Sequence, residues 1–134
     1  MATITKIIEV AAPSAAVWEA LSDFDAVHER VAPGFVVDCR GEGRDRVVTF
    51  VTGSVARERL VTIDDEARRL VYTVVDGPLG TTHHQASVVV ESVGERARLV
   101  WTTDVLPDER AAVIGSMMNA GADAIRRRFA RVTA

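Results

Sequence analysis

The order of the predicted elements indicates an α+β domain, in which a curved antiparallel sheet wraps around a long C-terminal helix. One strand comes first, two short helices follow, six further strands come next, and a long amphipathic helix closes the chain. The joints between the six strands are short, which favours sequential antiparallel pairing. A long helix across such a sheet encloses interior space, so we expect a container for a small molecule.

The composition fits one globular domain over residues 1–134. Hydrophobic residues make up 48% of the chain and charged residues 26%, the usual balance of a folded domain. No apolar run approaches the ~20 residues that span a bilayer, so membrane insertion is not expected. A lone cysteine, Cys39, fits a reducing cytoplasm. The formal net charge of −3 gives no reason to expect nucleic acid. The sequence is compatible with a monomer and with a homodimer.

The N-terminal part predicts a strand and two short helices. Residues 3–10 alternate between apolar and polar side chains, as in a half-buried strand. Pro13 or Ser14 begins the first helix, because proline suits a first turn and serine can cap it. Asp23 or Asp25 can cap the second. The apolar sides are Ile4, Ile8 and Val10 in the strand, Val17, Trp18 and Leu21 in the first helix, and Phe24, Val27 and Val31 in the second.

Six strands follow, predicted at residues 35–41, 45–52, 54–63, 68–76, 83–92 and 97–106. Alternate side chains of a strand point to opposite faces, so the more apolar set in each should face inward. Glu58 is placed inside because the opposite set would bury both Arg57 and Arg59. The inward sets of the last four strands are Ala56, Glu58 and Leu60; Leu70, Tyr72 and Val74; His84, Ala86, Val88 and Val90; and Leu99, Trp101, Thr103 and Val105.

The last segment predicts a helix of about 24 residues that opens at Pro107. One apolar stripe repeats at helical spacing and should lie against the sheet. Gly121 in this stripe would allow close approach of helix and sheet, or leave room for a ligand. The stripe consists of Ile114, Met118, Gly121, Ile125, Phe129 and Val132.

Face sorting directs the side chains of Glu58, Tyr72, His84 and Trp101 into one interior. A carboxylate, a phenol and an imidazole in an apolar cavity can exchange protons with a ligand. The alternative is that these groups satisfy each other or bind buried water. The candidate ligand-binding set is Glu58, Tyr72, His84, Trp101, Phe24 and Met118. We expect a cavity of about 300–1,000 Å³.

The sequence predicts neither a metal nor any other cofactor. His83 and His84 are adjacent in a strand and therefore point to opposite faces. The segment Gly41-Glu42-Gly43 joins two strands instead of opening a helix, so it offers no phosphate cradle. Cys39 lies in the middle of a strand, where a buried and inert thiol is expected.

Three segments carry a family resemblance: VAAPSAAVWEALSDFDAV, GRDRVVTFVTGSVARERLVTIDDEARRLVYTVV and ARLVWTTDVLP. They resemble the START-like (SRPBCC) superfamily, in particular its polyketide cyclase/dehydrase-like branch. The resemblance implies a helix-grip fold, with a seven-stranded sheet around the C-terminal helix, and binding of small apolar molecules such as polyketides, steroids or lipids. It also implies that Glu58, Tyr72 and Trp101 lie near the cavity. His84 stands where relatives often carry an aromatic residue.

Three functions are therefore open. The first is a binding protein for a small hydrophobic molecule. The second is a cofactor-independent cyclase or dehydratase, in which Glu58 or His84 acts as base and Tyr72 holds the enolate oxygen; its catalytic residues are not assigned. The third is an interaction module with a collapsed cavity. Few bulky side chains point inward, which favours a real cavity over the third.

Overall fold

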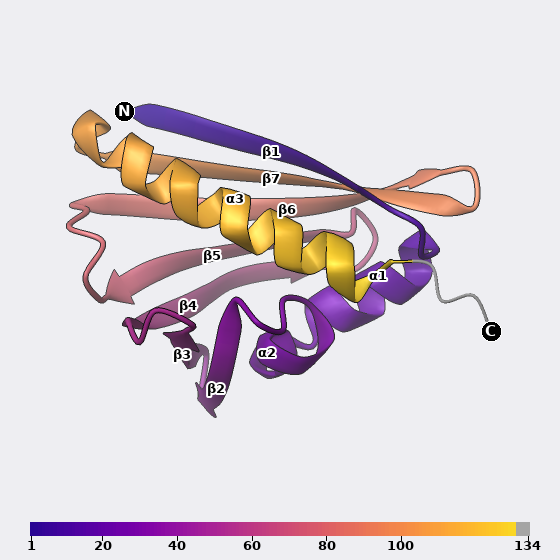
Figure 1. Ribbon diagram of the computed structural model, residues 1–134, viewed down its shortest axis with the longest axis horizontal. Helices are drawn as coiled ribbons and strands as arrows, with labels where there is room; N and C mark the ends of the chain where they lie inside the picture. The colour runs from indigo at the N-terminus through magenta and orange to yellow at the C-terminus, as the bar shows by residue number, and fades with distance from the viewer. Residues whose placement is uncertain (131–134) are drawn as a thin grey trace.

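The computed structural model describes residues 1–130, which form a seven-stranded sheet with helices on its concave side (Figure 1). The chain begins with β1 (Ala2–Val10), α1 (Ser14–Ser22), the 3₁₀ turn η1 (Phe24–Ala26) and α2 (Val27–Arg30). The remaining strands are β2 (Val36–Glu42), β3 (Asp45–Phe50), β4 (Val55–Asp64), β5 (Arg69–Asp76), β6 (His83–Val93) and β7 (Arg96–Leu106). The turn η2 (Asp108–Arg110) leads into the long helix α3 (Ala111–Arg128). The predicted fold class is confirmed.

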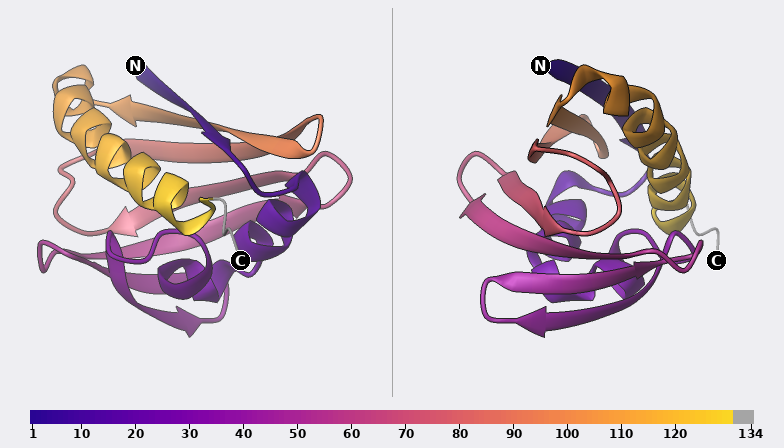
Figure 2. Two further views of the ribbon diagram at one scale, coloured as in Figure 1. Left: turned by 45° about the vertical axis from the view of Figure 1, so that its right-hand side comes forward. Right: turned by 90° about the vertical axis from the view of Figure 1, so that its left-hand side faces the viewer.

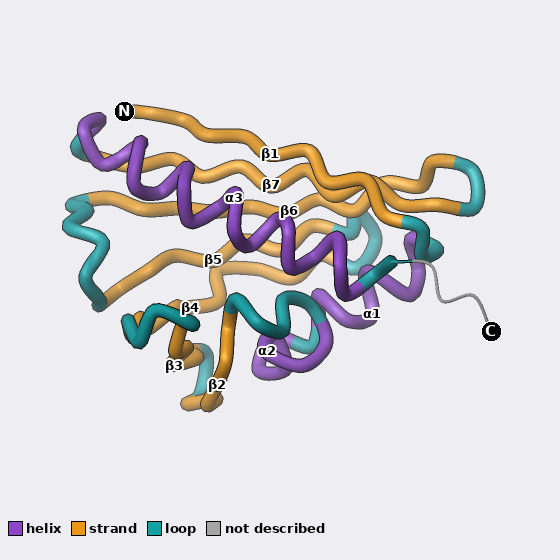
Figure 3. The backbone as a smooth tube through the Cα atoms, viewed as in Figure 1, coloured by secondary structure: helices purple, strands orange, loops and turns teal. Residues whose placement is uncertain are grey.

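The sheet is a meander from β2 to β7, and β1 is added at its far edge. The strand order is β1-β7-β6-β5-β4-β3-β2, with antiparallel pairing throughout. The turns between strands lie at the two ends of the sheet (Figure 3). Register shifts in the β2–β3 pair and at two places in the β4–β5 pair interrupt the regular pairing, and such bulges bend and twist a sheet. Figure 2 shows the resulting curl, with α3 across the open side.

The predicted inward faces of the strands are the buried ones. Leu99 and Ala86 are fully buried, and Leu70 is almost completely buried. Polar side chains are included in the same face: Glu58, His84 and Thr103 are each less than 10% exposed. The concave face of the sheet is therefore an apolar surface with a few polar groups.

Helix α1 begins directly after Pro13, as predicted, but Ser14 does not cap it. The Ser14 hydroxyl instead bonds the Ser92 hydroxyl and accepts a hydrogen bond from Arg68. No side-chain cap is found for η1 or α2 either. Packing of their apolar sides, with Val17 fully buried, therefore holds these short helices in place.

Helix α3 has 18 residues, so the predicted length of about 24 was too long. Phe129 still belongs to the buried stripe, but its backbone has left the helical conformation. Apolar periodicity therefore continued past the last helical residue. Val132, the last predicted member of the stripe, lies outside the described residues. No helix in residues 1–130 is long and apolar enough to cross a bilayer.

Candidate functional site

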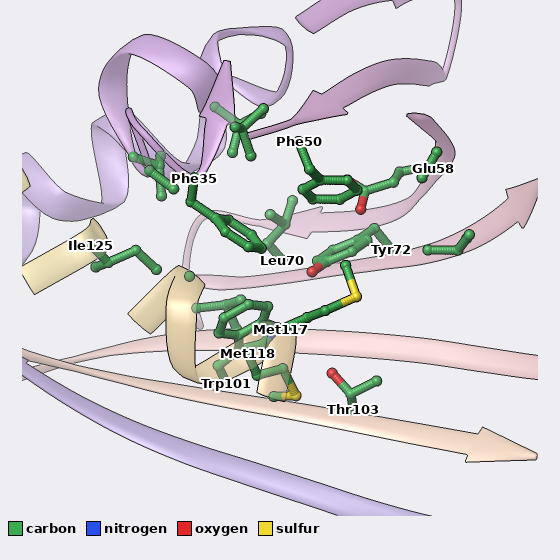
Figure 4. Close-up of a pocket in the computed structure, with 18 of the residues that line it drawn as sticks. Phe35, Phe50, Glu58, Leu70, Tyr72, Trp101, Thr103, Met117, Met118 and Ile125 are labelled. Carbon is green, nitrogen blue, oxygen red and sulfur yellow. The ribbon is translucent and has the colours of Figure 1, made fainter. Parts of the chain in front are cut away.

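A cavity of about 100 Å³ lies between α3 and the concave face of the sheet. Its wall is mostly hydrocarbon, with contributions from α3, the segment before β2 and the central strands (Figure 4). The cavity is smaller than the 300–1,000 Å³ that we expected. The side chains of Phe35, Trp101, Met117 and Met118 converge on it and fill much of the space (Figure 4).

The structure brings most of the candidate residues together. Glu58, Tyr72, His84, Trp101 and Met118 all line the cavity. Phe24 does not line it. The Arg46 guanidinium covers its ring, with Cζ 3.8 Å from the ring centroid. Phe24 therefore supports the cavity wall from behind.

Arg46 is the residue that the sequence reasoning missed. It lines the cavity beside Glu58, and its Nε donates a hydrogen bond of 2.8 Å to Glu58 Oε1. Its Nη1 donates a second bond of 2.7 Å to the Phe24 carbonyl. Both side chains are more than 90% buried. The two residues lie directly opposite each other in the β3–β4 pair. The correct register of this hairpin would therefore have placed Arg46 beside Glu58 in the interior.

Tyr72 lies in the middle of the polar groups. Burial raises the pKa of its hydroxyl far above the usual value, and the Glu58 charge adds to this. Arg46 and the Trp101 indole N–H, which faces the hydroxyl, lower the pKa of Tyr72 by smaller amounts. The phenol therefore stays protonated at neutral pH and acts as a hydrogen-bonding group.

His84 completes the pairing of β5 and β6. The regular ladder between these strands ends at Tyr72 and Ala86. Beyond it, the Val74 N–H donates to Nδ1 of His84 over 3.1 Å, and the Thr73 hydroxyl donates to the His84 carbonyl. Burial lowers the pKa of His84 to about 4. The ring is therefore neutral at pH 7, and its proton is on Nε2.

The other polar candidates among residues 1–130 lie outside the cavity wall. No cluster of potential metal ligands is found in residues 1–130. His83 points outward, opposite to His84. Burial raises the pKa of the Cys39 thiol to about 11, which makes it a poor nucleophile. On the outer face, Asp45 binds Arg57 and Arg59.

The wall can hold a small apolar molecule and offer it hydrogen bonds. It provides no free general base among the candidates. The Glu58 carboxylate is bound by Arg46, and the unprotonated nitrogen of His84 is bound by a backbone N–H. A group that already accepts a strong hydrogen bond is a weaker acceptor for a substrate proton.

Comparisons with solved structures agree with this architecture. The chain is similar to a Thermobifida fusca protein, with 34% identity over 99% of both chains and a TM-score of 0.71. It is also similar in fold to the protein XoxI from Bacillus cereus, with 20% identity, 96% of both chains covered and a TM-score of 0.85. A START superfamily protein from Mycobacterium smegmatis is 18% identical, with 95% of this chain and 96% of that chain covered and a TM-score of 0.74.

No curated protein matches the chain. A family model described as polyketide cyclase / dehydrase and lipid transport matches residues 1–133. This match spans nearly the whole sequence. The chain therefore belongs to the polyketide cyclase / dehydrase and lipid transport family.

Proposed function

We propose that the protein binds a small hydrophobic molecule of the polyketide, steroid or lipid type in the cavity under α3. The observation that carries the proposal is the wall itself. It is mainly hydrocarbon and includes a few buried polar side chains, namely Arg46, Glu58, Tyr72 and His84. Apolar pockets with a small number of placed polar groups are typical of small-molecule sites. The family description, which includes lipid transport, supports the same class of ligand.

The size of the cavity limits how such a ligand is accommodated. A space of about 100 Å³ is below the range that drug-sized ligands occupy. A larger ligand therefore has to displace side chains from the interior. Met117 and Met118 are suited to this, because methionine is unbranched and adapts its shape easily.

A cofactor-independent cyclase or dehydratase is the second candidate, and the family description favours it as well. Binding without chemistry is better supported, because the Arg46–Glu58 pair and the Val74–His84 hydrogen bond engage both proposed bases. If the protein is an enzyme, Glu58→Gln and His84→Asn should keep ligand binding and lose turnover about 100-fold or more. If both variants turn substrate over as fast as the unmodified protein, the enzymatic function is contradicted and only the binding function stands.

Two measurements test the binding proposal. Native mass spectrometry of gently purified protein should show a retained small molecule, and it also reports whether the protein is a monomer or a homodimer. In titrations with steroids, fatty acids and aromatic polyketides, a bound ligand should change Trp101 emission. Trp101→Phe should remove most of this response. Trp18→Phe is the matched control, because Trp18 lies outside the cavity lining and donates to Asp65.

An empty protein in the mass spectrum, together with unchanged emission across the whole panel, would contradict the proposal and favour a collapsed core. A cytoplasmic location remains part of the proposal. It rests on the single Cys39 of the sequence and on the rarity of disulfides in that compartment.

A further inference from the structure

Trp101 holds a buried hydrogen-bond donor that is not used. Its Nε1 is inaccessible to solvent and makes no hydrogen bond to any atom of residues 1–130. The indole lines the cavity. Its nitrogen lies close enough to the Tyr72 hydroxyl to lower the pKa of that phenol, but the two groups do not reach hydrogen-bond geometry. Buried donors in native proteins are nearly always satisfied, by protein or by something bound. This exception therefore needs an acceptor in the cavity.

The Trp101 ring cannot easily turn to find another partner. Its far edge lies beneath α3 at Gly121, where an added Cβ would be 3.0 Å from Cη2 and 3.1 Å from Cζ3 of the indole. Close packing of this kind fixes the ring orientation. The direction of the Nε1–H group is therefore built into the contact between α3 and β7.

Other donors surround the same space. The Tyr72 hydroxyl is protonated, since burial raises the pKa of this phenol strongly. His84 also lines the cavity, and because its Nδ1 accepts from Val74, the neutral ring carries a proton on Nε2. Tyr72 and Thr103 both pair with Ala86, so they lie in one row across three strands. Figure 4 shows the hydroxyl of Tyr72 directed toward the region of Trp101 and Met117.

The charges of the wall argue against an anionic ligand. Arg46 is the only guanidinium or ammonium group among the described lining residues, and Glu58 neutralises it over 2.8 Å. A carboxylate or phosphate would add an uncompensated charge to an apolar space, which is costly. A neutral acceptor oxygen carries no such penalty. A carbonyl oxygen accepts two hydrogen bonds and brings no donor that needs a partner of its own.

We propose that the bound molecule carries a ketone or similar carbonyl oxygen, which accepts hydrogen bonds from Trp101 Nε1–H and from the Tyr72 hydroxyl. This inference rests on the proposed binding function and narrows it. Ketone-bearing polyketides and oxidised steroids fit the wall. Fatty-acid anions would bring an uncompensated charge into it, and pure hydrocarbons carry no acceptor for its donors. Trp101 thereby becomes the residue that determines specificity within an otherwise unselective apolar pocket.

The test uses two small probes of nearly equal shape, cyclohexanone and methylcyclohexane. Each is titrated into the unmodified protein, Trp101→Phe, Tyr72→Phe and the control Trp18→Phe. The quantity to compare is the ratio of the two dissociation constants, because the cost of removing the ketone from water is the same for every variant and cancels. One neutral hydrogen bond predicts that Trp101→Phe reduces the preference for cyclohexanone about 3- to 10-fold. Trp18→Phe should leave the ratio unchanged.

A second readout does not depend on any variant. The protein has two indole N–H groups, and Trp18 already donates its own to Asp65 over 3.0 Å. Cyclohexanone should move the Trp101 indole proton resonance downfield and leave that of Trp18 in place. Methylcyclohexane, which has neither an acceptor nor an aromatic ring, should not produce the downfield shift.

The two possible failures are distinguishable. If both probes bind, the ratio is the same in Trp101→Phe, and the Trp101 resonance does not shift downfield with cyclohexanone, the carbonyl inference is wrong while the binding function stands. If neither probe binds the unmodified protein, with cyclohexanone at millimolar concentration and methylcyclohexane at its solubility limit, the binding proposal loses its support, and the carbonyl inference falls with it.

Discussion

Among single residues, Arg46 and Glu58 show how a charged pair is tolerated inside an apolar interior. The Arg46 guanidinium makes three interactions: an ion pair with Glu58, a hydrogen bond to the Phe24 carbonyl and a cation–π contact with the Phe24 ring. Such a buried pair contributes little net stability compared with an apolar replacement, but it is costly to break. Its role is therefore to fix the β3–β4 register and the position of η1.

The first prediction concerns this pair. Glu58→Gln keeps the shape of the side chain and leaves the buried Arg46 charge without a carboxylate. The free energy of unfolding should fall by about 3–5 kcal/mol in urea titrations at pH 7. The double variant Arg46→Met with Glu58→Leu should lose less, because both charges are then removed. Arg59→Met removes one of the two ion pairs of Asp45 and should cost much less, because the Arg59 side chain is half exposed to solvent. A loss in Glu58→Gln no larger than that in Arg59→Met would contradict the prediction.

The second prediction concerns His84 and pH. Burial lowers the pKa of His84 in the folded protein from the ordinary value of 6.5 to about 4. Between these pH values the unfolded chain binds more protons, so stability falls as the pH drops from about 6.5 to 4. The loss in the free energy of unfolding that is due to His84 approaches about 3 kcal/mol near pH 4. His84→Asn, which can still accept the Val74 N–H, should lose this part of the pH dependence.

The matched control for His84 is its exposed neighbour. His83→Asn removes an exposed imidazole without touching the buried Val74–His84 hydrogen bond, so it should not reproduce the effect of His84→Asn. The measurement is urea unfolding of the three proteins at several values between pH 4 and 7. Parallel curves for His84→Asn and the unmodified protein would show that His84 is not the titrating group.

Among the elements, α3 determines how much of the interior is filled. The helix carries two glycines with different surroundings. Gly121 lies against the Trp101 and Phe35 rings, with less than 3.3 Å from an ideal Cβ to each, whereas the nearest atom to a Cβ at Gly115 is Ile4 Cγ2 at 3.8 Å. One position allows close approach of helix and sheet, and the other has ordinary space.

The third prediction uses this difference. Gly121→Ala should destabilise the protein by about 1–3 kcal/mol, because the added methyl group overpacks the contact with two aromatic rings. Gly115→Ala should stabilise it by about 0.5–1 kcal/mol, because alanine is the better helix former and meets no obstacle. The stability of both variants is measured by thermal unfolding and compared with that of the unmodified protein. Equal effects of the two substitutions would show that the tight contact at Gly121 is not a constraint.

The extent to which the fold followed from the sequence can be seen in two elements. Strand alternation placed Tyr72 and Trp101 correctly, because a period of two assigns faces regardless of register. The Arg46–Glu58 pair could not be predicted from the sequence in this way. A two-residue turn at Thr52–Gly53 would place Arg46 opposite Arg59, whereas the longer turn from Phe50 to Ser54 shifts the register by one residue. Cross-strand neighbours depend on such turn geometry, which composition does not determine.

For the whole molecule, the size of the cavity was the least predictable property. The sequence identified the lining strands, but the volume depends on how the side chains of separate elements interlock. Phe35, from the segment before β2, reaches across to α3 at Gly121 and packs against the tilted Phe50 ring, with 5.2 Å between ring centroids. No local pattern in the sequence links these positions. The space that remains is therefore a property of the assembled fold.

The last prediction follows from the position of Phe35. This side chain lines the cavity and is partly exposed to solvent, so it closes the gap between the start of β2 and α3. Phe35→Ala should increase the association and dissociation rates of a neutral apolar fluorophore such as N-phenylnaphthylamine, each on the order of tenfold. The dissociation constant should change less, because a barrier is lowered in both directions. Val37→Ala, at an exposed position nearby, is the control and should leave the stopped-flow rates unchanged. Unaltered rates in Phe35→Ala would place the route into the cavity elsewhere along α3.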